Sequence, residues 1–135
     1  HPFPELYAPG ERAAAVKRLQ QWFTHEAKSD LERRVAWHAD RLSVQPGRLT
    51  IRDQTSRWGS CSTTGALSFS WRLVLAPPAV LDYVAAHEVA HLREMNHGPR
   101  FWVLVRKSCP GMDEAKRWLR IYGMDLHRYG VEYGD

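Results

Sequence analysis

The stretch on which the predicted fold depends is HEVAHLREMNH, at residues 87–97. On a helix, side chains four residues apart lie on the same face, with Cβ atoms about 5–6 Å apart. This spacing lets the imidazoles of His87 and His91 converge on one metal ion. Glu88 lies beside them, where its carboxylate is suited to take a proton from a metal-bound water. The pattern therefore indicates a catalytic metal centre on a helix.

A third histidine follows at a workable distance. His97 comes six residues after His91, so the helix has to end between them if His97 is to return towards the metal. Asn96 precedes Gly98-Pro99, and asparagine tolerates the left-handed conformation that ends many helices. We therefore expect one Zn2+ ion bound by His87, His91 and His97, with a fourth position for water.

Chance and structural zinc are the two competing interpretations of this motif. A bare HExxH also arises by chance, but here it lies in a helical pattern with a third histidine and a helix stop. Structural zinc sites usually have four protein ligands that are rich in cysteine. The chain has two cysteines, Cys61 and Cys109, and no CxxC pair. A catalytic site is favoured.

Length and composition indicate one globular domain. The chain has 135 residues, of which 44% are hydrophobic and 25% charged, as is usual for soluble proteins. No apolar run approaches the roughly 18 residues of a membrane span, and no signal-peptide pattern is visible. Two cysteines fit a reducing compartment, so we expect a cytoplasmic protein. The expected organisation is an extended segment at residues 1–10 and a single domain at 11–135, with a truncated longer protein as an open alternative.

The first part of the predicted domain is a long helix. Between residues 11 and 44, apolar residues recur every four positions. They are Leu19, Phe23, Ala27, Leu31 and Val35. Ser29-Asp30 could cap a second helix, but the apolar stripe continues through it without a phase change, which favours one helix. His25 and His38 lie on this helix, and we expect them to be surface or packing residues.

The rest of the predicted domain combines short strands with further helices. The turn STTG at residues 62–65 predicts an antiparallel hairpin between the last two strands, and prolines mark helix starts. The predicted strands lie within residues 48–53, 57–62 and 67–73, and the predicted helices begin at Pro78, Pro99 and Asp113. This order of elements is typical of an α+β fold with a small, mostly antiparallel sheet.

Several stretches together resemble the YgjP-like metallopeptidase family, which is related to the SprT-type zinc proteases and other zincins. They are RWGSCS at 57–62, RLVLAP at 72–77 and DYVAAHEVAHLREMNHGPRFW at 82–102. The resemblance covers roughly residues 11–126. It implies a minimal zincin-like fold: a long N-terminal helix, a small sheet, an active-site helix and two C-terminal helices. It also implies zinc bound by the three histidines, with Glu88 as general base.

Two departures qualify this resemblance. Metzincin proteases have a glycine three residues after the second histidine, where this chain has Glu94, and no convincing methionine turn follows. A metzincin is therefore disfavoured. YgjP-like proteins often carry additional strands before the long helix, so either those strands are dispensable or the chain is truncated.

The expected function is hydrolysis of peptide bonds by a zinc-bound water that Glu88 activates, with a peptide or protein as substrate. We expect Trp58, Gly59 and Ser60 to form an edge strand along which an extended peptide pairs. Arg57 is one candidate for stabilising the oxyanion, and a C-terminal tyrosine or His127 is another.

Two rival functions stay open at this stage. A metal-dependent nucleotide phosphohydrolase would use the same activated water, although no glycine-rich phosphate loop is present. A DNA-associated protease or binding module is the other rival. The net charge of +4 and the fifteen arginines are compatible with weak nucleic-acid association. The sequence leaves the oligomeric state open.

Overall fold

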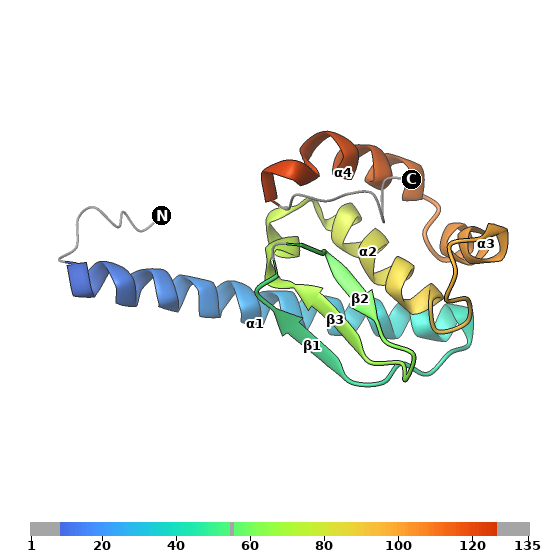
Figure 1. The fold of residues 1–135 in the computed structure, drawn as a ribbon, viewed down its shortest axis with the longest axis horizontal. Coiled ribbons are helices and arrows are strands. Elements are labelled where there is room, and N and C mark those ends of the chain that lie inside the picture. Colours follow the sequence, from blue (N-terminus) through green and yellow to red (C-terminus); the bar gives the residue numbers. More distant parts are fainter. Residues whose placement is uncertain (1–8, 55, 127–135) are drawn as a thin grey trace.

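A single long helix runs along the other elements of the fold, and its N-terminal end extends beyond them (Figure 1). In the computed structural model, which describes residues 9–54 and 56–126, helix α1 spans Pro9–Leu42 without a break. The prediction of one long helix is confirmed. The helix begins at Pro9, so the last two residues of the predicted extended segment are helical, as a proline in a first turn allows. Residues 1–8 lie outside the described residues.

The end of α1 is a Schellman-type turn. Ser43 adopts a positive φ of 57°, and the N–H of Val44 donates to the carbonyl of Ala39 at 3.0 Å. This pattern satisfies carbonyl groups that the last turn would otherwise leave without a helical partner. Chain reversal here places the following segment beside the helix.

Three short strands form a mixed sheet. They are β1 (Leu49–Arg52), β2 (Gly59–Cys61) and β3 (Leu67–Ser70), in the order β1-β3-β2. The β2–β3 hairpin is antiparallel, as the turn at 62–65 predicts, whereas β1 pairs with β3 in parallel. Because β3 lies between the other two strands, β1 pairs with β3 and not with β2. In this order β2 is an edge strand.

The segment after β3 departs from the predicted pattern. The third strand ends at Ser70, and the 3-10 helix η2 (Trp71–Leu75) follows. The Ser70 hydroxyl accepts a hydrogen bond from the N–H of Arg72 at 3.2 Å. This cap favours a helical turn over a longer strand, even though the period-two pattern runs on to Leu73.

Three more helices complete the fold, and their starts agree with the predictions to within one residue. They are α2 (Pro78–Ala90), α3 (Pro99–Ser108) and α4 (Met112–Leu126). Helix α2 contacts α1, α3, α4 and β2, and Figure 1 shows it inside the fold. Ten of its thirteen residues are buried, as expected for a helix that is apolar on most sides. Among the described helices, none combines the length and apolar character that crossing a membrane requires.

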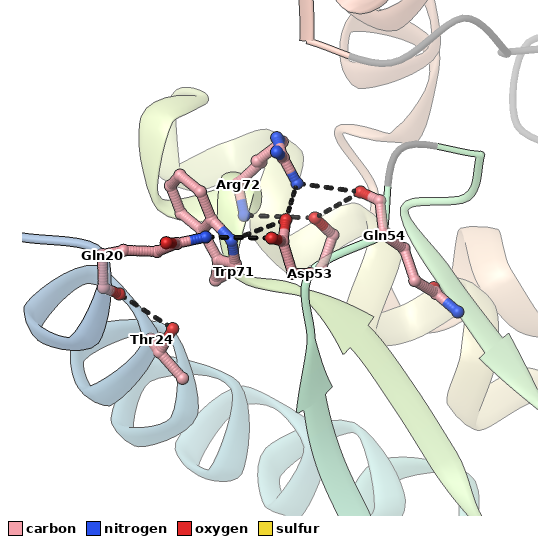
Figure 2. A network of polar contacts seen from close by, with 7 residues as sticks. Gln20, Thr24, Asp53, Gln54, Trp71 and Arg72 are labelled. Carbon is pink, nitrogen blue, oxygen red and sulfur yellow. Dashed lines mark hydrogen bonds and ion pairs between the residues drawn. The ribbon is translucent and has the colours of Figure 1, made fainter. Parts of the chain in front are cut away.

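Asp53 joins the sheet to the two neighbouring helical elements (Figure 2). Its carboxylate accepts hydrogen bonds from Gln20 of α1 at 2.9 Å, Trp71 at 3.1 Å and Arg72 at 2.5 Å. The hydrogen bond from Arg72 is the main reason that the pKa of Asp53 lies below its ordinary value. Arg72 also donates to the Gln54 carbonyl at 3.1 Å, so this network fixes the start of the loop that leads to β2.

Candidate metal centre

The three histidines of the motif converge at the end of α2. One ring nitrogen from each of His87, His91 and His97 lies within 4.8 Å of the others. The Nε2 atoms of His91 and His97 are 3.0 Å apart. A hydrogen bond or a shared cation can join two imidazole nitrogens at this distance. The structure therefore brings together the residues that the motif predicts.

The helix ends earlier than the sequence suggests. Helix α2 stops at Ala90, and His91 occupies the C-cap with φ −62° and ψ −18°. The helix does end before His97, as the motif requires, but not through a left-handed Asn96, since Ser43 is the one non-glycine residue with positive φ in the described part of the chain. After the helix, the Glu94 carbonyl lies 3.0 Å from Nδ1 of the His91 ring.

The partners of the other ring nitrogens suit metal binding. The Glu94 carbonyl can only accept a hydrogen bond, so the Nδ1 atom of His91 carries the hydrogen and Nε2 keeps a lone pair in the neutral ring. The Nδ1 atom of His87 lies 3.0 Å from Oε2 of Glu88, where a carboxylate dictates the same tautomer. Metal-binding histidines usually donate their second N–H to a carbonyl or carboxylate. This donor set fits zinc.

The protonation states also suit a metal. Burial lowers the pKa of His91 and of His97, and the neighbouring His87 lowers both further. A neutral imidazole is the form that binds a metal. His91 and His97 are therefore available as neutral ligands at neutral pH.

Aromatic side chains from the first turn of α3 hold the histidines. Phe101 stacks on His91 with ring centroids 4.4 Å apart, and Trp102 stacks on His97 at 5.9 Å. The side chain of His87 is fully buried, and His97 is exposed. The centre is thus closed towards the core and open on the side of His97.

Strand β2 packs closely against the helix at Glu88, which is fully buried. A Cβ atom on Gly59 would lie 3.2 Å from Cγ of Glu88 and 3.1 Å from the Ser68 carbonyl oxygen. These distances are shorter than an ordinary contact of a Cβ atom, so any side chain at this position would push its neighbours apart. Cys61 of the same strand is half-buried, and burial together with the nearby Glu88 raises its pKa to about 11.

The four predicted substrate-binding residues differ in how exposed they are. Arg57 is exposed and Ser60 is half-buried, whereas Trp58 and Gly59 are buried. The indole of Trp58 has no exposed surface, so this side chain is part of the core. A peptide substrate could contact only the backbone of this residue. The other oxyanion candidates, His127 and the tyrosines that follow it, lie outside the described residues.

A buried polar network behind α2 was not predicted. His38 is fully buried, and its Nε2 atom lies 2.7 Å from Oδ1 of Asp82 on α2. Its Nδ1 atom contacts the hydroxyl of Ser108 on α3, and Arg34 donates to the same oxygen of Asp82 at 2.6 Å. The expectation of an ordinary surface or packing residue therefore misses the role of His38, which ties three helices together. Its one sequence signal is its position in phase with the apolar stripe of α1.

A pocket of about 360 Å³ beside His91 was also missed. It is bounded by the residues that follow α1, by the turn at 62–65 and by the residues that follow α2, and His91 forms part of its wall. Nothing in the local sequence indicated it, because its walls come from three distant segments.

Comparisons with known proteins agree with this architecture. The solved structure of the metallopeptidase zymogen abylysin from Pyrococcus abyssi is similar in fold, with a TM-score of 0.61 and 23% sequence identity; the match covers 72% of this chain and 96% of that one. A comparison with curated proteins gives no match. The family model for the YgjP-like metallopeptidase domain matches residues 5–122. The chain therefore belongs to the YgjP-like metallopeptidase family.

Proposed function

We propose that this chain hydrolyses peptide bonds in peptides or proteins, with one Zn2+ ion held by His87, His91 and His97 and with Glu88 as general base. Its family and its fold are those of metallopeptidases. The observation that carries the residue assignment is the convergence of three histidine nitrogens within 4.8 Å beside a buried carboxylate. Family membership favours a peptide bond over a phosphoanhydride as the substrate.

Each histidine has an assigned ligand atom in this proposal. The Nδ1 atoms of His87 and His91 face Glu88 and the Glu94 carbonyl, so we assign Nε2 of both rings to the metal, together with Nε2 of His97. When bound, zinc lowers the pKa of a water towards about 7 and polarises a carbonyl.

Glu88 moves the proton in this scheme. Its carboxylate accepts a proton from the attacking water and delivers it to the leaving amine. Packing against Gly59 and contact with the His87 ring restrict the side chain, and a restricted base needs little reorganisation during the reaction.

The substrate lies along β2 in this scheme. An edge strand has backbone N–H and C=O groups that can pair with an extended peptide, and β2 forms one edge of the sheet. It also contacts α2, so a paired peptide would lie close to the helix that carries His87 and Glu88. Arg57 is exposed near the start of this strand and is our candidate for stabilising the oxyanion.

The test is the variant Glu88→Gln. We expect this protein to retain zinc while the rate of peptide hydrolysis falls by about 10²–10⁴-fold, the usual contribution of a general base. The matched control is Glu114→Gln, which removes an exposed carboxylate on α4 and should leave the rate unchanged. Full activity of purified Glu88→Gln protein would refute the assignment of the base.

A further inference from the structure

The pocket beside His91 has walls that are fixed in place. The N–H of Gly47 donates to the Gly65 carbonyl at 2.8 Å, which ties the turn at 62–65 to the segment that follows α1. Within the turn, Ser62 Oγ lies 2.9 Å from Thr64 Oγ1 and accepts from the N–H of Ala66 at 3.0 Å. Gly65 adopts a φ of 89°, which favours glycine. The turn is thus a preformed wall.

The lining of the pocket is polar, and its fixed charge is positive. Hydroxyl and amide side chains come from the turn and from Gln45, and Met95 adds an apolar surface. Arg93 lines the pocket, and no carboxylate does so among the residues that the structure describes. A side chain with a negative charge therefore fits this lining better than a neutral or positive one.

Arg93 is placed to make this contact. One guanidinium nitrogen, Nη1, donates to the Leu42 carbonyl at 3.4 Å, which orients the side chain towards the end of α1. A guanidinium has five N–H donors, so the others can reach a carboxylate, and a planar fork suits that group. The side chain is exposed and therefore accessible to a ligand.

We propose that this pocket is a specificity subsite that takes a glutamate or aspartate side chain of the peptide substrate, on one side of the scissile bond. The proposal rests on the proposed function: a peptide held at the histidines would lie beside the pocket, because His91 belongs both to the metal centre and to the pocket wall. A volume of about 360 Å³ accommodates one such side chain. Arg93 is the residue that selects the charge.

The experiment measures peptide binding in the zinc-loaded Glu88→Gln protein, so that no turnover is needed. The probes are fluorescein-labelled peptides of alanine and serine in which one glutamate, glutamine or lysine is moved through successive positions. At one position, we expect glutamate to bind about tenfold more tightly than lysine, as a hydrogen bond to a charged group allows. Adding Arg93→Glu should reverse the preference, and Arg93→Lys should retain it.

The control is Arg120→Glu, which makes the same change of charge at an exposed position of α4; it should leave the glutamate preference intact. Equal binding of glutamate and lysine at every position, or no binding of any probe, would overturn the proposal, as would an unchanged preference in Arg93→Glu. Absent turnover in the wild-type protein would instead count against the proposed function, because the binding measurement does not depend on hydrolysis.

Discussion

Gly59 of β2 lies directly against Glu88 of α2, so closely that a methyl group on residue 59 would fit only if its neighbours moved. A Cβ atom on residue 59 would be 3.0 Å from Cδ1 of Phe69 and 3.2 Å from Cγ of Glu88. Both of these side chains are fully buried, so neither can move into solvent. The edge strand and the proposed base are therefore fixed relative to each other.

Gly59→Ala should destabilise the protein and reduce its activity. The added methyl group has to displace buried neighbours and the Ser68 carbonyl, and overpacking of this kind costs about 1–3 kcal/mol. Denaturant titration measures the loss in free energy of unfolding. The control is Gly111→Ala, where a Cβ atom would meet nothing within 4 Å. Equal stability and activity in the two variants would show that β2 can move away from Glu88.

His97→Ala should weaken zinc binding. The mutation removes one of three converging imidazoles. Removing a residue that only hydrogen-bonds a metal ligand lowers metal affinity by about 10–100-fold, so removing a ligand itself should lower zinc affinity by more. A chelator competition experiment measures the zinc affinity. His25→Ala, at an exposed position of α1, is the matched control and should bind zinc normally. Unchanged zinc affinity in His97→Ala would place the third ligand elsewhere.

Asp82→Asn should remove a pH-dependent contribution to stability. Burial alone would raise the pKa of Asp82, but hydrogen bonds from His38 and Arg34 outweigh it and lower the pKa below the ordinary value of 3.8. The carboxylate therefore stabilises the fold above pH 3.8, and this contribution disappears as the pH falls through the lower folded pKa. At neutral pH we expect the variant to be less stable by about 1–3 kcal/mol.

The measurement for Asp82 is urea denaturation of both proteins over a series of pH values. The difference in free energy of unfolding between wild type and Asp82→Asn should be constant at neutral pH and should shrink in acid. Asp40→Asn, at an exposed position of α1, should show a much smaller difference. A difference that grows in acid would contradict the lowered pKa.

Local sequence signals predicted most of the elements. The apolar repeat of α1, the turn at 62–65 and the proline that begins α2 each depend on neighbouring residues, so the sequence alone was sufficient for them. The parallel pairing of β1 with β3 could not be predicted, since it depends on where a distant strand packs. The early end of β3 reflects the Ser70 cap, which competes with the period-two pattern.

The candidate site, too, was predictable from the sequence only in part. His87, His91 and His97 could be identified because they lie within eleven residues and follow a helical spacing. The partners of His38 could not, since Asp82 and Ser108 lie 44 and 70 residues away in the chain. The pocket at Arg93 likewise comes from three segments whose proximity is a property of the fold.

The most direct test of the central claim is an anomalous-scattering measurement at the zinc absorption edge on crystals of the zinc-loaded protein. The account predicts one strong peak between the rings of His87, His91 and His97, with a nitrogen of each at about 2.0–2.1 Å. A zinc peak bound by other residues, or none at these three rings, would contradict it.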